Sequence, residues 1–238
     1  MRKEVTKSVC ERIMSITDRV KELVKEGNNG HELIELDKEF WGIKEEYDLF
    51  DRVFEEDGKK GVVDILGNVV VPPLYEDYAE LYNYSILAHK PIPACDSNDK
   101  YALVTSDGKG TPLCAFEYDM LRFKFGGGCL YQCWKRDGEK FLVGVIDREG
   151  NMIVPCEMDE IYGFCNNYAV VEKGNKVGAV TAGGFYIEPL YDDFEESDGF
   201  LTACKDGVWG YISAKGEFID MADEERLDEE EWLCLFGY

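Results

Sequence analysis

Adjacent carboxylates are the residues of this sequence best suited to chemistry. Pairs stand at Glu76-Asp77 and Asp192-Asp193, and two neighbouring carboxylates can transfer protons or bind Ca²⁺. Both pairs follow a strand-like segment that contains proline, at equivalent places in a repeating pattern. This recurrence favours a structural role, in which the side chains accept hydrogen bonds from nearby backbone amides in turns.

Nucleophilic and phosphate-binding motifs are missing from the sequence. The two histidines, His31 and His89, lie in different segments, and neither adjoins a Cys or Ser in a nucleophile motif. The sequence has no Walker loop and no His-Glu-x-x-His, and the glycines at 126–128 precede a strand and indicate a flexible turn. We therefore expect no catalytic residue, no cofactor and no enzymatic activity.

The nine cysteines do not have the spacing of a zinc site. Cys129 and Cys133 are four apart and do not form the paired Cys-x-x-Cys motif. Most cysteines, such as Cys204 and Cys234, lie in strand-like segments, where a reduced thiol behaves as a small hydrophobe. We predict buried, reduced thiols, no metal ligands and a reducing compartment.

Short strands must position these side chains. The strands belong to a pattern that occurs in five copies, about 32 to 42 residues apart. In each copy a strand contains a glycine, and a second glycine six residues later allows the positive φ of a tight hairpin turn. A second strand follows, and in three copies a proline (Pro72, Pro155 or Pro189) ends it, because proline cannot donate to a ladder. A further strand precedes each copy, at residues 52–58, 85–90, 130–138, 168–174 and 201–207. The repeat glycines are Gly61, Gly67, Gly108, Gly144, Gly150, Gly178, Gly184, Gly210 and Gly216, and Ala102 replaces the first glycine of the second copy.

This pattern resembles the WG-repeat family, named for a Trp-Gly pair that stands intact here only at Trp209-Gly210. Lys60, Tyr101, Val143 and Val177 replace the tryptophan in the other copies. The resemblance covers roughly residues 50–221 and implies a bacterial-type β-repeat module whose biochemical role is generally unassigned. The expected fold is mainly β, with about five three-stranded β-meander repeats, either propeller-like or stacked as an open array.

An amphipathic α-helix is predicted at residues 1–26. Its apolar residues recur at intervals of three and four on a single stripe, namely Val5, Val9, Ile13, Ile16, Val20 and Leu23. The stripe must pack against the repeat body or pair with a second copy of the chain in a homodimer, since its spacing is also heptad-like. Trp41-Gly42 imitates the repeat motif by chance, because Asp48 stands where the second glycine should fall.

The sequence thus divides into an N-terminal helical segment and linker (1–49), a β-repeat domain (50–221), and an acidic segment with an apolar C-terminal strand (222–238). Residues 231–238 are too apolar to remain in water. If they complete the sheet begun near Phe54, the array closes and its exposed edges disappear.

The charge balance excludes some partners. With 49 acidic and 26 basic residues, the net charge is -23, which would repel DNA, RNA and anionic membranes. No apolar run is long enough for a membrane span, and no signal peptide is recognised, so we expect a cytoplasmic protein. The charge serves either solubility or the attraction of a basic protein partner.

The leading hypothesis is a non-enzymatic protein-interaction module. Residues 89–99 are predicted to form a surface loop in which Pro91 and Pro93 lower the entropy lost on binding. The alternative is an acidic inhibitor or immunity-type protein that neutralises a basic toxin or nucleic-acid enzyme, and a third hypothesis is a small-ligand binder with a pocket between repeats. Candidate partner-binding residues are Pro91, Pro93, Glu224, Glu225, Glu229 and Glu230.

Overall fold

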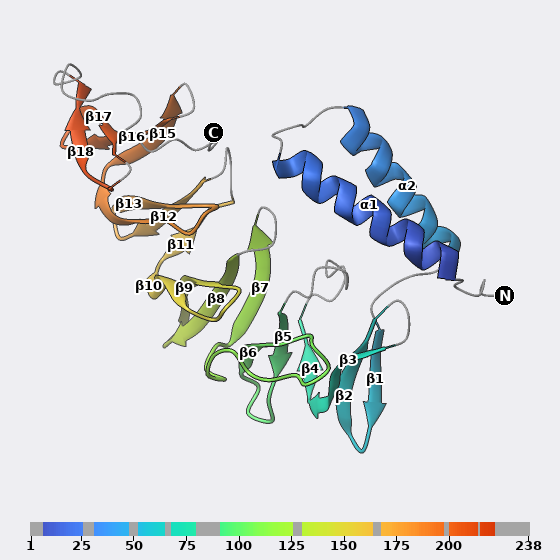
Figure 1. Ribbon diagram of the computed structural model, residues 1–238. Helices are drawn as coiled ribbons and strands as arrows, with labels where there is room; N and C mark the ends of the chain where they lie inside the picture. Colours follow the sequence, from blue (N-terminus) through green and yellow to red (C-terminus); the bar gives the residue numbers. More distant parts are fainter. Residues whose placement is uncertain are drawn as a thin grey trace. The chain divides into compact units, whose positions relative to one another are not determined.

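The computed structural model describes residues 7–25, 31–47, 52–64, 68–79, 91–125, 130–163, 168–197, 200–213 and 215–221. Helices form the N-terminal part, and antiparallel strands form most of the rest (Figure 1). The chain divides into two compact units, one comprising residues 1–97 and 104–112 and the other residues 98–103 and 113–238. The mainly β fold with an N-terminal helix is therefore confirmed.

The first unit begins with helices α1 (Lys7–Lys25) and α2 (His31–Tyr47). Arg12 forms a two-pronged ion pair with Glu39, with N···O distances of 2.6 and 2.7 Å, and Arg19 pairs with Glu32 at 2.8 Å. Both pairs are exposed to solvent, so they add little to stability.

The expected apolar stripe exists on α1. Ile13, Ile16 and Leu23 are buried within the chain itself, whereas Val5 lies outside the described residues. The segment expected to be a linker is largely the helix α2, which contains Trp41-Gly42. The interpretation of this Trp-Gly pair as a chance match is confirmed, because it does not lie in a strand.

The first unit continues with a three-stranded sheet of β1 (Arg52–Glu56), β2 (Lys59–Val63) and β3 (Val69–Tyr75). The next sheet has the order β4 (Asp77–Tyr78), β5 (Ile92–Cys95) and β6 (Tyr101–Val104). The expected Asp-Gly turn between β1 and β2 is present, with φ of 52° at Asp57 and 76° at Gly58.

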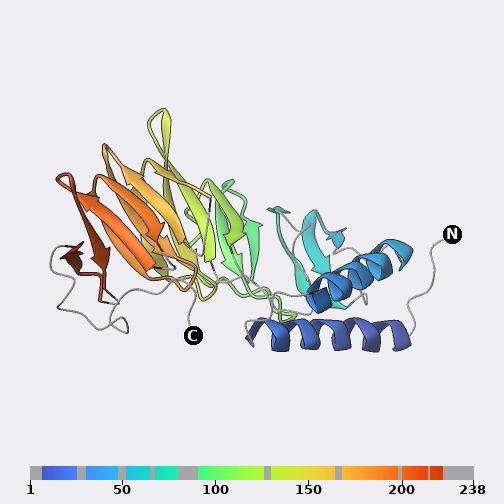
Figure 2. The ribbon, with the colours of Figure 1, turned by 90° about the horizontal axis from the view of Figure 1, so that it is seen from above.

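Three four-stranded sheets make up most of the second unit. The first contains β7 (Met120–Phe125), β8 (Leu130–Asp137), β9 (Lys140–Asp147) and β10 (Met152–Met158). The second contains β11 (Glu160–Ile161), β12 (Tyr168–Lys173), β13 (Lys176–Thr181) and β14 (Tyr186–Tyr191). The third contains β15 (Asp193–Ser197), β16 (Phe200–Lys205), β17 (Val208–Ile212) and β18 (Phe218–Asp220). Each sheet is an antiparallel meander, and the three follow one another in sequence order (Figure 2).

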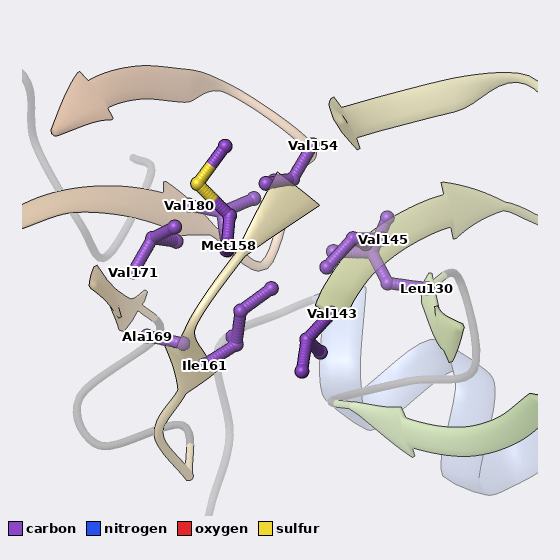
Figure 3. Close-up of a cluster of buried hydrophobic side chains, with 9 residues drawn as sticks. All are labelled: Leu130, Val143, Val145, Val154, Met158, Ile161, Ala169, Val171 and Val180. Carbon is purple, nitrogen blue, oxygen red and sulfur yellow. The ribbon is translucent and has the colours of Figure 1, made fainter. Parts of the chain in front are cut away.

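The core of the second unit lies between consecutive sheets. One buried cluster joins residues of β8, β9 and β10, such as Val145 and Met158, to residues of β11, β12 and β13, such as Ile161 and Val171 (Figure 3). A second cluster joins Ala179 of β13 and residues of β14 to residues of β15, β16 and β17. The three sheets of the second unit therefore bury their apolar faces on one another in sequence order, as expected of a repeat architecture.

Two expectations about this array need correction or stay untested. The prolines do not end their strands: Pro72, Pro155 and Pro189 lie inside β3, β10 and β14. These are edge strands of their sheets, where a missing N–H costs little because one side of the strand has no ladder partner. Closure by residues 231–238 lies outside the described part of the chain, and a propeller is not confirmed.

None of the helices in the described residues is long and apolar enough to cross a membrane.

Candidate functional site

The second glycine of each repeat forms the predicted turn. Gly108, Gly150, Gly184 and Gly216 have φ between +84° and +88°, a region that L side chains rarely adopt. The prediction of positive φ is confirmed at these four positions, and Gly67 lies outside the described residues.

The first glycine of the repeat has a different role, which the sequence reasoning missed. In the sheets of Gly61, Gly144 and Gly178, the pairing with the neighbouring edge strand shifts register at the glycine, as at a β-bulge. A Cβ on Gly178 would lie 2.3 Å from the carbonyl oxygen of Ile187, and one on Gly144 would lie 2.8 Å from the Cα of Cys156. The bulged backbone therefore folds over the glycine, and only a residue without a side chain fits there.

A further recurrent side chain stands three residues after the first glycine. The position is occupied by Asp64, Thr105, Asp147, Thr181 and Ser213. The Asp147 carboxylate accepts hydrogen bonds from the N–H groups of Glu149 (2.9 Å) and Asn151 (2.7 Å). These oxygens fix the hairpin that contains the second glycine, and the recurrence of Asp, Thr or Ser at one offset is a sequence signal that could have found them.

Asp119, Asp159 and Asp192, here called the bridging aspartates, connect successive hairpins. Each forms an ion pair with a lysine, and the Nζ···Oδ1 distances are 2.7 Å for Lys100 and Asp119, 3.0 Å for Lys140 and Asp159, and 2.6 Å for Lys176 and Asp192. The second carboxylate oxygen accepts from a backbone N–H of the following hairpin, that of Arg136, Gly174 or Asp206, at 2.7 to 2.8 Å.

These contacts lower the pKa of each bridging aspartate below its ordinary value. The main cause is the lysine hydrogen bond for Asp119 and Asp192, and the Gly174 N–H for Asp159. The expectation that the paired carboxylates bond to backbone amides is confirmed for Asp192, and Asp119 and Asp159 have the same arrangement. In the first copy, Glu76 and Asp77 instead pair with Lys59 and Lys60.

The proline candidates do not lie in a surface loop. Residues 92–95 form strand β5, and Pro91 and Pro93 are buried. Proline is tolerated here because its carbonyl still accepts, as that of Pro93 does from the Ala79 N–H at 3.1 Å, and its fixed φ suits extended chain. The other candidates, Glu224, Glu225, Glu229 and Glu230, lie outside the described residues.

The edge strands of the repeats carry exposed apolar side chains at recurring positions. The residue between the proline and the buried tyrosine is Leu74 in β3 and Leu190 in β14, and these side chains are 51% and 57% exposed. Met152, at the start of β10, is 43% exposed. Carboxylates accompany them: Glu157 on β10 and Glu188 on β14 are also exposed. We call Met152, Glu157, Glu188 and Leu190 the edge surface of the second unit.

Thiols are the most reactive groups that the fold brings together. Cys133 of β8 is buried and Cys156 of β10 is half-buried, and the Cys156 thiol lies 3.6 Å from the backbone carbonyl oxygen of Cys133. The Cys156 thiol also lies 3.3 Å from the carbonyl oxygen of Leu142. No group of three or more His, Cys, Asp or Glu side chains in the described part of the chain could hold a metal ion.

These features define a β-repeat protein, built from short antiparallel meanders in which two glycines of distinct function recur. A family model described as the WG containing repeat matches residues 61–85 and 144–176. The resemblance noted in the sequence is thereby confirmed: the chain contains WG-type β-repeats.

Other comparisons add little. No curated protein matches the chain. Among solved structures, the crystal structure of the eukaryotic initiation factor is similar, with 18% sequence identity over 68% of this chain and 47% of that chain, and a TM-score of 0.35. The chain thus spans about half the length of that structure.

Proposed function

We propose that this protein is a non-enzymatic interaction module whose β-repeats present apolar side chains bordered by carboxylates to a basic protein partner. The observation that carries the proposal is the exposed leucine at one repeat position, which occurs at Leu74 and again at Leu190. A single exposed leucine needs no explanation. Two at equivalent positions, each after a proline and before a buried tyrosine, indicate a repeated surface feature.

The chemistry of the edge surface favours a basic partner. Glu188 and Leu190 are two residues apart on β14 and both are exposed, so an aliphatic side chain and a carboxylate stand side by side. The net charge of -23 would accelerate encounters with a basic protein and repel acidic ones. Lysine and arginine side chains suit such a surface, because their aliphatic stems cover apolar groups while their charged ends reach the carboxylates.

The edge prolines favour recognition through side chains over strand addition. Pro155 and Pro189 lie in the edge strands β10 and β14, and proline has no N–H to offer an incoming strand. A partner would therefore contact the outward side chains of the edge surface and would not extend the sheet.

A non-enzymatic role is supported by how the carboxylates are used. The bridging aspartates, which include Asp192 of the pair considered above for acid–base chemistry, each bind a lysine and a backbone N–H. A low pKa also makes them weak general bases near neutral pH.

The test is affinity capture from the native host with the wild-type protein and with a Met152→Ser, Leu190→Ser double variant. Val208→Ser is a matched control, because Val208 is 43% exposed but lies on β17, outside the edge surface. We expect a basic protein that is captured by the wild type and the control and lost with the double variant. Retention of the same partner by the double variant would contradict the proposal. If the captured partner is an enzyme that loses activity on binding, this result would favour the inhibitor hypothesis over a simple interaction module.

A further inference from the structure

Cys133 and Cys156 approach each other over Gly144, the first glycine of the third repeat. Cys133 on β8 is the ladder partner of Gly144 on β9, so its side chain leaves the sheet on the face where a Gly144 side chain would stand. That space is filled by Cys156: a Cβ on Gly144 would lie 2.8 Å from both its Cα and its N. The two cysteines therefore occupy one face of the sheet on either side of a residue that has no side chain.

The spacing suits a disulfide. Opposed Cβ atoms in an antiparallel ladder are about 4.5 to 5.5 Å apart, and the Cys156 backbone stands close to where the Cβ of Gly144 would be. The two cysteines are therefore neighbours on one face of the sheet, and a disulfide between them requires a Cα separation of about 4.4 to 6.8 Å. The Cys156 thiol reaches to 3.6 Å from the backbone carbonyl oxygen of Cys133, so its sulfur already points toward β8.

This pair is a departure from the repeat's own pattern. In the other described copies, the residue opposite the first glycine is Phe54, Val171 or Ala203. The bulge residue over that glycine is Pro73 in the first copy and Pro189 in the fourth. Apolar residues and proline thus satisfy the fold at both positions, and packing alone does not require two thiols in the third copy.

The two sulfurs differ in the way that a peroxide-reactive pair needs. Cys156 is half-buried and Cys133 is buried with no exposed surface, so Cys156 is the more accessible residue of the two. The neighbouring Cys133 thiol lowers the pKa of Cys156, and burial opposes this effect. The same contact, together with burial, raises the pKa of Cys133.

We propose that Cys156 and Cys133 form an oxidation site for hydrogen peroxide, with Cys156 as the attacking thiol and Cys133 as the resolving thiol. In the first step the Cys156 thiolate attacks one peroxide oxygen, the O–O bond breaks, and hydroxide leaves and takes up the thiol proton as water. In the second step the Cys133 sulfur attacks the resulting sulfenic acid, an S–S bond forms, and the S–O bond breaks with release of a second water. The dithiol loses two hydrogen atoms, and the peroxide is reduced to two waters.

The disulfide would link β8 to β10 across β9. These two strands are not ladder neighbours, so the cross-link would fasten the bulged edge strand, which carries Met152 and Glu157, to the interior of its sheet. Oxidation would thus act on part of the edge surface, although the proposal does not depend on what that surface binds.

The test treats the full-length reduced protein with stoichiometric hydrogen peroxide and measures the intact mass and the unreduced tryptic peptides. We expect the loss of two hydrogen atoms, reversed by dithiothreitol, and a cross-link between the peptides 125–135 and 149–173, which contain Cys133 and Cys156. Each peptide also contains a second cysteine, Cys129 or Cys165. Cys129→Ser and Cys165→Ser are therefore the matched controls, and the cross-link should persist in both.

Single variants separate the two roles. Cys133→Ala should stop the reaction at the first step, so that dimedone, a reagent for sulfenic acids, labels Cys156, whereas Cys156→Ala should leave Cys133 unlabelled. The absence of the cross-link in the peroxide-treated wild type, or its persistence in Cys156→Ala, would overturn the proposal. Labelling of Cys133 in Cys156→Ala would reverse the assigned order of attack and overturn that part.

Discussion

Replacing Gly178 by alanine tests the role of the first glycine directly. The added Cβ would lie 2.3 Å from the carbonyl oxygen of Ile187, 2.7 Å from the carbonyl carbon of Glu188 and 2.8 Å from the nitrogen of Pro189. All three are backbone atoms, so no side-chain rotation relieves the contact, and the bulge of β14 must move. Overpacking of this kind costs about 1 to 3 kcal/mol. The smaller entropy of the unfolded alanine chain returns only about 0.4 to 1 kcal/mol. The difference between the central values of these two ranges gives an expected net loss of about 1.3 kcal/mol.

The assay is urea unfolding followed by circular dichroism, with Gly163→Ala as the matched control. Gly163 belongs to the same unit, and a Cβ there would have no atom within 4 Å, so this variant should match the wild type or be slightly more stable. The midpoint should fall for Gly178→Ala with little change in slope, since the surface exposed on unfolding is the same. Equal midpoints for the two variants would refute the role assigned to the bulge.

Four further outcomes are expected. Gly150→Val should cost about 1 to 3 kcal/mol of unfolding free energy because φ is +88°, and an unchanged melting temperature would place the turn elsewhere. Ile161→Ala should cost about 2 to 5 kcal/mol because the side chain lies in the core between two sheets, as thermal unfolding would show. The bridging aspartates have lowered pKa values in the folded protein. Their contribution to the free energy of unfolding is therefore complete above the unfolded pKa of about 3.9 and is lost as the pH falls through the folded pKa. The urea midpoint should drop between about pH 5 and pH 3, and this drop should be smaller in Asp159→Asn. Association with a captured basic partner should slow several-fold between about 50 and 500 mM salt as the Debye length shrinks, whereas salt-independent rates would assign the net charge to solubility alone.

The hairpins could be predicted because their signals are local. A glycine six residues after another, preceded by a strand and an Asp-Gly turn, determines the backbone conformation with little help from the rest of the chain. The turns at Gly150 and Gly184 and the strands beginning at Leu130 and Tyr168 were predicted on this basis and are present.

The features that were missed depend on neighbouring strands. The sequence predicts that Pro72, Pro155 and Pro189 end their strands, because a proline has no N–H to donate to a ladder. An edge strand has a ladder partner on one side only, so a proline can lie inside it. The prediction of a loop at Pro93 is wrong for a related reason, because a strand can still use the carbonyl of a proline as an acceptor. The first glycine was assigned no spatial role because the bulge that covers it comes from a strand about ten residues further on. For the same reason the contact between Cys133 and Cys156 has no signature in the sequence, because it depends on the register of three strands.

The bridging aspartates Asp159 and Asp192 are each the single residue between the last strand of one sheet and the first strand of the next. The first glycine of a repeat lies in the third strand of its sheet, as Gly178 does in β13, so the sequence repeat counted from its glycines is out of phase with the sheets by two strands. Excision of residues 160–192 would join Asp159 to β15 and remove one complete sheet, β11 to β14, with the junction at equivalent positions. Excision from Gly144 to Gly178 would instead fuse portions of two sheets. For duplication or loss of copies in such an array, the natural boundary between modules is the aspartate and not the Trp-Gly position that gives the repeat its name.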